Sequence, residues 1–340
     1  MKKRIFAAAV MILMISFSAC SKQENQQSNI AKEDEKYSEI LTYLNDSSYT
    51  DITQISRARI ISTNPTDTAL AGSAVTYYAE ISGKTAEGEN ITQRFNQVNV
   101  SEAANESDYT FLRSNTIAIY DDGSQKNISL TVTFGPLTES FTYNVVKQEV
   151  SENNYALLVN TFTGVGETFE PSDLVVSDWI YYTNGRSNTV SQLRSEANAA
   201  LEQMFTAAEN DGIELWACSG YRPYDMQQKL YDAAVASLGE DQNDTAKPGY
   251  SEHQTGLTMD ITWASASGGL YQSMEYDEEY AWLTENSYKY GWVLRYPKDS
   301  EDITLYMFEP WHYRYIGVEM ATAYHESGMS TLDEFLSVVR

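Results

Sequence analysis

The segment from Pro248 to Ile261 reads Pro-Gly-Tyr-Ser-Glu-His-Gln-Thr-Gly-Leu-Thr-Met-Asp-Ile and decides how the C-terminal half is interpreted. Its two possible metal ligands, His253 and Asp260, are separated by Gly256, which lets the backbone fold back. A loop and the strand after it can therefore present both side chains to one ion. A catalytic zinc takes three protein ligands from His, Asp or Glu and keeps a fourth position for water.

A second segment, Phe308 to Tyr315, reads Phe-Glu-Pro-Trp-His-Tyr-Arg-Tyr and supplies a third candidate ligand. Glu309 and His312 are three residues apart, a separation that puts both side chains on one face of a turn. Pro310 disfavours a long helix through Glu309, so we expect a tight turn or a first helical turn. In this arrangement His312 would face a metal and Glu309 its water.

A third segment, Ser219-Gly220-Tyr221-Arg222, follows an apolar strand and precedes a helix that includes Gln227. Spacing alone leaves an alternative open for His253 and His312, because an isolated histidine is commonly a packed or solvated residue. We expect His325, the third histidine of the chain, to be such a packed or solvated residue.

Taken in order, these motifs resemble those of the M15 family of zinc D-Ala-D-Ala carboxypeptidases, in its VanY-like branch, which also includes L,D-carboxypeptidases. The family pattern S-x-H-x(6)-D matches Ser251 to Asp260, and E-x-x-H matches Glu309 to His312. The similarity covers roughly residues 155–317, and it includes Tyr290-Gly291-Trp292-Val293-Leu294-Arg295-Tyr296-Pro297.

The resemblance implies a role for each matching residue. It makes His253, Asp260 and His312 the ligands of Zn2+ and Glu309 the general base, while Arg222 holds the substrate carbonyl and the developing oxyanion. Ser251 and Gln227 fall on matching positions and are expected to contact substrate.

The implied reaction is removal of the C-terminal D-Ala from peptidoglycan stem peptides. Alternatives are an L,D-carboxypeptidase acting on tetrapeptide stems, a non-catalytic module that binds wall peptides, and a lysin that cuts inside cross-links.

Two further expectations concern substrate binding. Arg222 is assigned to the reacting carbonyl, so the substrate carboxylate needs hydroxyls, backbone donors or a second cation such as Arg295 or Arg314. Aromatic residues near the motifs are candidates either for flanking the peptide or for the core; they are Tyr250, Trp263, Trp311 and Tyr313.

The sequence of residues 151–340 outside these motifs predicts an α+β domain that contains a small antiparallel sheet and helices. From Gln192 to Asn210 apolar residues recur at spacings of three and four, which indicates an amphipathic helix. Asp211-Gly212 ends it, and Ile213 to Cys218 follows as a strand.

Residues 51–150 predict an all-β, immunoglobulin-like sandwich. Short runs rich in Val, Ile, Thr, Tyr and Phe alternate with turn clusters such as Asp121-Asp122-Gly123. Between Ile128 and Phe134 apolar and polar residues alternate strictly, as a half-buried strand requires. The region has no His or Cys, and we interpret it as a spacer, with ligand binding as the alternative.

The N-terminus predicts export. A basic start, an apolar run from Ile5 to Phe17 and small residues before Cys20 resemble the lipobox of bacterial lipoproteins. We therefore expect a signal peptide over residues 1–19, a lipidated Cys20 that anchors the chain to the membrane facing the cell wall, and a polar tether over residues 20–50. The alternative is an ordinary signal peptide with an incidental cysteine.

Charge and composition exclude other classes. The 340 residues include 48 acidic and 23 basic side chains, for a net charge of -25, so binding to nucleic acid through phosphate neutralisation is excluded. Two cysteines rule out a disulfide framework, and three histidines rule out a His-rich metal cluster.

Overall fold

The computed structural model describes residues 32–33, 35–47, 50–102, 108–120, 126–176, 189–240 and 242–338. The predicted signal peptide, Cys20 and the first part of the predicted tether lie outside these residues. Among the described helices, none is both long enough and apolar enough to cross a bilayer.

The chain forms two compact units. The first contains the described residues of Met1–Ile61, Tyr78–Asn99 and Thr131–Glu139. The second contains those of Ser62–Tyr77, Val100–Leu130 and Ser140–Arg340. The predicted boundary at residue 150 does not coincide with the border between these units.

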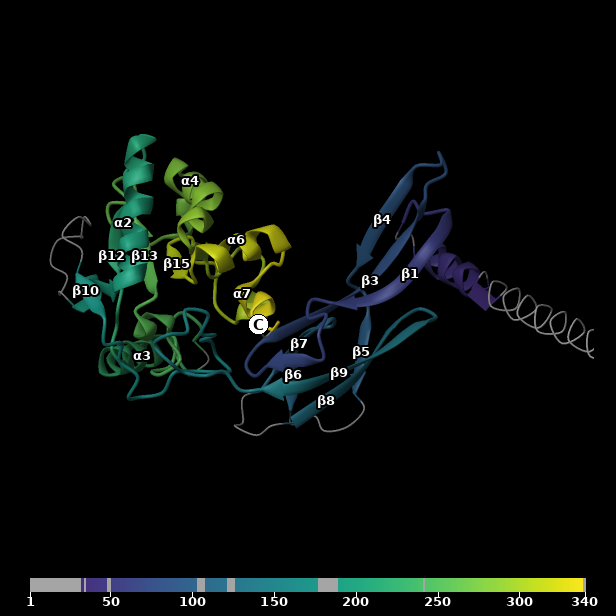
Figure 1. Ribbon diagram of the computed structural model, residues 1–340, viewed down its shortest axis with the longest axis horizontal. Coiled ribbons are helices and arrows are strands. Elements are labelled where there is room, and N and C mark those ends of the chain that lie inside the picture. Colours follow the sequence, from purple (N-terminus) through teal and green to yellow (C-terminus); the bar gives the residue numbers. More distant parts are fainter. Residues whose placement is uncertain are drawn as a thin grey trace, which may run out of the picture. The chain divides into compact units, whose positions relative to one another are not determined.

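The described part of residues 51–150 contains strands and no helix. The strands are β1 (Gln54–Ser62), β2 (Thr68–Leu70), β3 (Ala74–Lys84), β4 (Asn90–Phe95), β5 (Asn99–Glu102), β6 (Tyr109–Arg113), β7 (Thr116–Ile119), β8 (Lys126–Phe134) and β9 (Leu137–Val146). One sheet has the order β1-β3-β7-β6, with β4 also paired to β3, and the other has the order β2-β9-β8-β5 (Figure 1). The immunoglobulin-like topology stays a prediction.

Strand β8 shows why this sequence folds as a sheet. Its residues alternate as predicted, and Ile128, Leu130, Val132 and Phe134 are each at most 3% exposed. Phe134 lies against Phe95 of β4, with ring centroids 5.3 Å apart, so side chains of the two sheets share a core.

The tether is shorter than predicted. Residues 35–46 are helical, and Ile40 and Leu44, one turn apart, are fully buried. Tyr43 packs edge-on against Phe134, with ring centroids 5.0 Å apart. The prediction of a polar tether over residues 20–50 is therefore wrong for residues 35–46, because their apolar stripe gives the helix a face to bury.

Residues 151–338 form the α+β part. Its strands are β10 (Leu174–Val176), β11 (Gln192–Arg194), β12 (Trp216–Ser219), β13 (Thr258–Thr262), β14 (Trp292–Leu294) and β15 (His312–Tyr315). Its α-helices are α2 (Ser195–Asn210), α3 (Tyr224–Leu238), α4 (Glu278–Asn286), α5 (Glu301–Thr304), α6 (Val318–Ser327) and α7 (Leu332–Phe335). Its 3₁₀ helices are η1 (Thr189–Ser191), η2 (Glu252–Thr255), η3 (Gln272–Tyr276) and η4 (Ser287–Tyr290).

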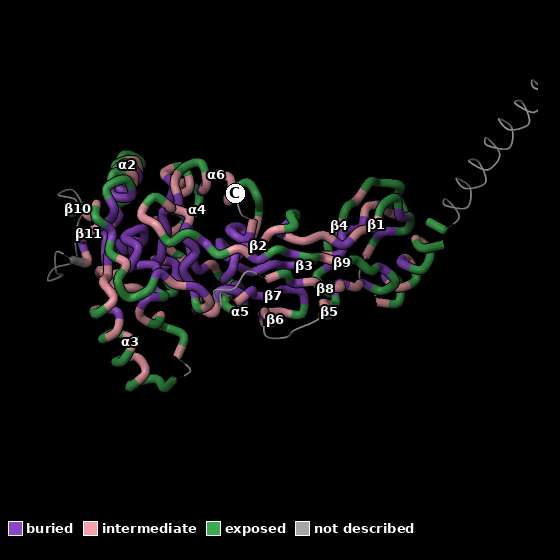
Figure 2. Tube along the Cα trace, turned by 60° about the horizontal axis from the view of Figure 1, so that its bottom comes forward, coloured by how far each residue is buried: buried purple, intermediate pink, exposed green. Residues whose placement is uncertain are grey.

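An antiparallel sheet of order β12-β13-β15-β14 lies at the centre of this part, as predicted. Helix α2 covers it (Figure 1), and the buried stripe of α2, which includes Leu201, Met204 and Phe205, shares a core with Met259 and Ile261 of β13. Figure 2 shows that α2 has both a buried and an exposed side. The predicted helix over residues 192–210 is thus confirmed, except that residues 192–194 are the strand β11.

Several buried hydrogen bonds explain why residues 62–77 belong to the second unit. The side chain of Asn160 donates to the carbonyl oxygen of Gly72 at 2.9 Å. Thr76 donates its hydroxyl to Glu334 at 2.5 Å, and Asn64 donates to the carbonyl oxygen of Ser337 at 2.9 Å. These bonds join residues far apart in sequence, so a pattern read along the chain did not reveal them.

Candidate functional site

Two neighbouring strands carry the first two candidate ligands. Strands β13 and β15 are antiparallel, and their register sets Asp260 directly opposite His312. Because residues opposite one another in such a pair have their Cβ atoms about 5 Å apart, the two side chains lie together on one face of the sheet.

The third candidate, His253, comes from η2 just before β13. Gly256 ends η2 with a φ of 66°, the left-handed backbone that glycine adopts without strain. A Cβ atom at this position would lie 2.9 Å from Leu174 and 3.0 Å from Arg194. The structure therefore confirms that the chain folds back at Gly256, and this turn brings His253 beside the strand.

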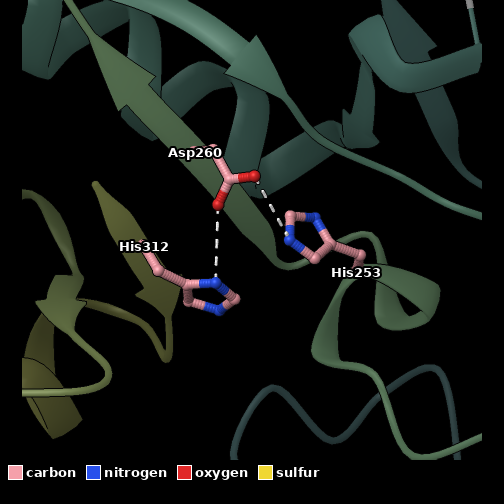
Figure 3. A group of neighbouring side chains, drawn as sticks. All are labelled: His253, Asp260 and His312. Carbon is pink, nitrogen blue, oxygen red and sulfur yellow. Dashed lines mark ion pairs between the residues drawn. The ribbon is translucent and has the colours of Figure 1, made fainter. Parts of the chain in front are cut away.

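The three side chains converge (Figure 3). Asp260 Oδ2 lies 3.5 Å from His253 Nε2, and Asp260 Oδ1 lies 3.4 Å from His312 Nδ1. One ligand atom from each residue lies within 4.8 Å of the others, and each residue is at most 5% exposed. Sequence spacing and three-dimensional geometry thus select the same three residues.

The donor set fits a catalytic zinc. Two imidazoles and one carboxylate are typical ligands of such an ion. Asp260 Oδ1 is buried and accepts no hydrogen bond from the residues that the structure describes, as expected of an atom that faces a metal. Burial would raise the pKa of Asp260, but His253 and His312 lower it far below its usual range, so the carboxyl is ionised.

The protonation of His253 also suits a ligand. Burial, and next to it the charge of Arg222, lowers the pKa of this imidazole, which favours its neutral form. Its Nδ1 lies 2.7 Å from the carbonyl oxygen of Gly220. A hydrogen bond donated from Nδ1 would leave the lone pair of Nε2 available to bind an ion shared with Asp260.

Glu309 lies beside these ligands. The backbone N–H of His312 donates to the carbonyl oxygen of Glu309 at 3.1 Å, so the segment forms the tight turn that we expected. The carboxylate oxygen Oε2 of Glu309 lies 3.2 Å from His312 Nδ1. Burial raises the pKa of Glu309 above its ordinary value, which suits a group that takes and returns a proton.

Arg222 follows β12 and is held near the carboxylate of Asp260. Its Nη2 lies 3.9 Å from Asp260 Oδ2 and donates to the hydroxyl of Ser219 at 3.3 Å. Its Nη1 donates to Gln227 Oε1 at 2.8 Å, and Gln227 in turn donates to the carbonyl oxygen of Ala246 at 2.7 Å. Gln227 therefore orients the guanidinium group.

All seven predicted site residues line one cavity of about 300 Å³. They are Arg222, Gln227, Ser251, His253, Asp260, Glu309 and His312. Ser251 is buried at the wall of this cavity and precedes η2.

The aromatic candidates divide between wall and core. Trp311 lines the cavity, and Tyr250 lines a neighbouring cavity of about 110 Å³. Trp263 and Tyr313 are fully buried in the core under the sheet. The first two can therefore flank a peptide, whereas the last two support the strands.

The expectation that Arg295 or Arg314 binds the substrate carboxylate is wrong. Both side chains are 0% exposed and donate to the carboxylate of Glu252 at 2.8 Å. The sequence motifs did not indicate that Glu252 pairs with both arginines. An acidic residue directly before a candidate ligand was the available signal, but its partners lie on other strands and loops.

Comparisons with known proteins agree with this geometry. Residues 190–318 match a family model described as VanY, D-alanyl-D-alanine carboxypeptidase. The putative carboxypeptidase YodJ of Bacillus subtilis is 40% identical over 210 residues, which cover 59% of this chain and 76% of that protein.

Two further proteins are similar to this chain. A D-alanyl-D-alanine carboxypeptidase of Enterococcus faecalis is 39% identical over 148 residues, which cover 40% of this chain and 53% of that protein. A solved structure of the LdcB LD-carboxypeptidase is 40% identical with a TM-score of 0.52, covering 55% of this chain and 88% of that one.

Proposed function

The chain belongs to the VanY family of D-alanyl-D-alanine carboxypeptidases, and on that premise we propose that it is a zinc-dependent enzyme of the bacterial cell wall. Its reaction is hydrolysis of the last peptide bond of peptidoglycan stem peptides, which releases the C-terminal D-Ala. This metallopeptidase activity depends on Zn2+ held by His253, Asp260 and His312.

One observation carries the proposal. The ligand atoms of the three residues lie within 4.8 Å of one another at the wall of a cavity, and a carboxylate that is not needed as a ligand, Glu309, lies beside them. A module that only binds wall peptides has no use for this fourth group, whereas hydrolysis requires a proton acceptor.

The chain's own residues divide the work of hydrolysis. When bound, zinc supplies a Lewis acid that polarises the scissile carbonyl and activates water. Oε2 of Glu309 takes a proton from the attacking water and passes it to the departing amine. The guanidinium group of Arg222, always charged and oriented by Gln227, donates hydrogen bonds to the developing oxyanion.

A specific observation favours a second candidate, L,D-carboxypeptidase activity on tetrapeptide stems. The LdcB LD-carboxypeptidase shares 40% identity and has a TM-score of 0.52, so the fold of this chain suits that substrate too. The two activities differ in the configuration of the residue before the scissile bond, which the wall of the cavity must recognise.

The test is digestion of purified pentapeptide and tetrapeptide stems with and without a chelator, with the products weighed by mass spectrometry. Loss of one D-Ala from the pentapeptide alone supports the first candidate, and loss from the tetrapeptide alone supports the second. Full activity in the presence of the chelator would contradict a zinc enzyme, and no cleavage by the zinc-loaded protein would favour the binding module.

A second test separates a carboxypeptidase from a lysin that cuts inside cross-links. A carboxypeptidase must bind the free C-terminal carboxylate, which needs donors because an unpaired buried anion costs several kcal/mol. Since Arg295 and Arg314 are already occupied, hydroxyl and backbone donors remain for this task, and Ser251 is a candidate at the cavity wall. Peptides capped as C-terminal amides should be cleaved poorly, and equal rates on both forms would favour the lysin.

The location of the enzyme is part of the proposal. The N-terminal sequence supports export as a lipoprotein, with diacylated Cys20 in the membrane and the chain facing the cell wall. We propose that residues 51–150, as an immunoglobulin-like sandwich, act as a spacer. Cys20→Ser should release the protein from membranes, and unchanged fractionation would mean that something else holds it there.

A further inference from the structure

Glu252 is a buried acid that the proposed reaction does not use. It is 1% exposed and precedes the candidate ligand His253, yet its carboxylate faces the other histidine. Its Oε2 lies 3.4 Å from Nε2 of His312, within hydrogen-bond distance. Its Oε1 accepts hydrogen bonds from Arg295 Nε and Arg314 Nη1, both at 2.8 Å.

We propose that Glu252 is a positioning residue for the zinc site. It accepts a hydrogen bond from Nε2–H of His312, which leaves Nδ1 of that ring to act as the ligand atom. The inference rests on the proposed zinc function. Hydrogen bonds from ligand histidines to carboxylates fix the tautomer and the ring orientation, and they make the ligand nitrogen more basic.

The orientation of His312 supports this role. Nδ1 of the ring faces Asp260 Oδ1 at 3.4 Å and Glu309 Oε2 at 3.2 Å, so this nitrogen points into the site. Nε2, on the other side of the ring, points to Glu252. The ring therefore bridges the ligand group and the buried acid.

Buried partners hold Glu252 in place. Arg295 and Arg314 are both 0% exposed. Arg295 also donates to Asp333 at 2.6 Å and 3.1 Å, and Arg314 donates to the carbonyl oxygen of Leu157 at 2.7 Å. The two arginines and the two carboxylates balance in charge, so the carboxylate of Glu252 cannot turn away without leaving a buried cation unpaired.

The outermost member of this cluster is Asp333 in α7, which lies beyond the residues 190–318 that match the family model. Asp333 also accepts a hydrogen bond from Asn160 at 2.6 Å. The orientation of a zinc ligand is thus tied to residues outside the segment that defines the family.

The two histidine ligands should consequently have opposite tautomers. His253 places Nδ1 at the carbonyl oxygen of Gly220 and presents Nε2 to the site. His312 places Nε2 at Glu252 and presents Nδ1. This difference gives a spectroscopic signature that a merely structural role for Glu252 would not produce.

The first experiment uses NMR on the zinc-loaded full chain, labelled with ¹⁵N in its three histidine rings. We expect a protonated Nδ1 in His253 and a protonated Nε2 in His312, with the Nε2 proton of His312 protected from exchange. A His312 ring that is protonated at Nδ1 and bound to zinc through Nε2 would overturn the positioning role and leave the zinc function intact. A chain that binds no zinc would instead contradict the proposed function.

The second experiment compares Glu252→Gln with the matched variant Glu334→Gln. Glu334 is equally buried, at 1% exposed, but its carboxylate contacts Thr76 and Thr331. Zinc affinity, measured by competition with a chromogenic chelator, should fall about 10- to 100-fold in Glu252→Gln, and it should be unchanged in Glu334→Gln.

Two results would contradict the proposal. One is wild-type zinc affinity in Glu252→Gln together with an unchanged NMR pattern for His312. The other is an equal loss of affinity in Glu334→Gln, because this would trace the effect to general destabilisation. If Glu252→Gln does not fold, the tautomer of His312 in the wild-type chain decides the question.

Discussion

Oε2 of Glu309 lies 3.2 Å from Nδ1 of His312, the same ring atom that faces Oδ1 of Asp260 at 3.4 Å. The carboxylates of the proposed base and of a proposed zinc ligand therefore meet at one nitrogen, although Glu309 is in a turn and Asp260 is in strand β13. This proximity makes the two roles separable by substitution.

Glu309→Gln should retain zinc and lose turnover. The amide keeps the shape of the side chain but cannot accept the proton from water, so we expect kcat to fall by about 10²- to 10⁴-fold. Elemental analysis and a D-Ala release assay on the same sample measure both quantities. Near-normal turnover would place the base elsewhere.

His253→Ala should lose stoichiometric zinc, because two ligands do not make a stable catalytic site. The matched control is His325→Ala. His325 lies in α6 and stacks on Tyr288, with ring centroids 3.8 Å apart. Elemental analysis should find one zinc per chain in the control and much less in His253→Ala, and full retention in the latter would refute the ligand assignment.

Arg222→Lys should lower kcat without removing zinc. Lysine keeps the positive charge but cannot reproduce the planar fork that Gln227 orients, so we expect a loss of about 10²- to 10³-fold. Steady-state kinetics at saturating substrate measure the change. Lys229→Ala is a control in α3, since the Lys229 side chain is 80% exposed, and a comparable loss there would point to an indirect effect.

Glu80 should make the stability of the first unit depend on pH. Hydrogen bonds from Arg59, opposed by burial and reinforced by Arg94, lower the pKa of Glu80. A lowered folded-state pKa means that the stabilisation is fully present above the unfolded value of about 4.3 and is lost as the pH falls through the folded value.

The measurement compares melting temperatures of the wild type and Glu80→Gln. The variant should be less stable by about 1 kcal/mol at neutral pH, because both arginines are partly exposed and solvent screens their charge. The difference should vanish in strong acid. A constant difference across this range would contradict the assignment, and Glu87→Gln, an exposed residue of the same unit, is the control.

Residues 151–340 expressed alone should be less stable than residues 50–340. Leu70 packs in one buried cluster with Leu158 and Phe335, and its removal would expose them. Glu334 would also lose its hydrogen bond from Thr76. Thermal melting and size-exclusion chromatography of both chains test this, and equal melting temperatures would show that the predicted boundary at residue 150 is a folding boundary after all.

Much of the fold could be predicted because local periodicity carries it. Alternation in β8 and the apolar stripe of α2 are properties of short segments, and both are present in the structure. The helix over residues 35–46 was not predicted, because its buried face rests on few apolar residues, such as Ile40 and Leu44, within a largely polar segment. The grouping of residues 62–77 with the second unit depends on hydrogen bonds between distant residues, which no local pattern encodes.

The candidate site, like the fold, could be predicted only in part. Residue type and spacing made the three proposed ligands and Glu309 candidates, and the resemblance of the motifs to the M15 family gave each its expected role. The contact between Glu252 and His312 could not be predicted in this way. Glu252 adjoins His253 in sequence, but the register of β13 and β15 brings it to face His312. Their positive charge made Arg295 and Arg314 candidates for binding the substrate carboxylate. Their burial depends on packing between distant segments, which charge alone does not reveal.

The contact between Thr76 and Glu334 joins residues 258 positions apart. Synthesis proceeds from the N-terminus, so strand β3 is made long before its partner Glu334. The same holds for Arg295, whose acidic partner Asp333 is added 38 residues later. Until then Arg295 and Arg314 share the single carboxylate of Glu252, so the charges behind the candidate site are balanced only after Asp333 has been made and α7 has docked.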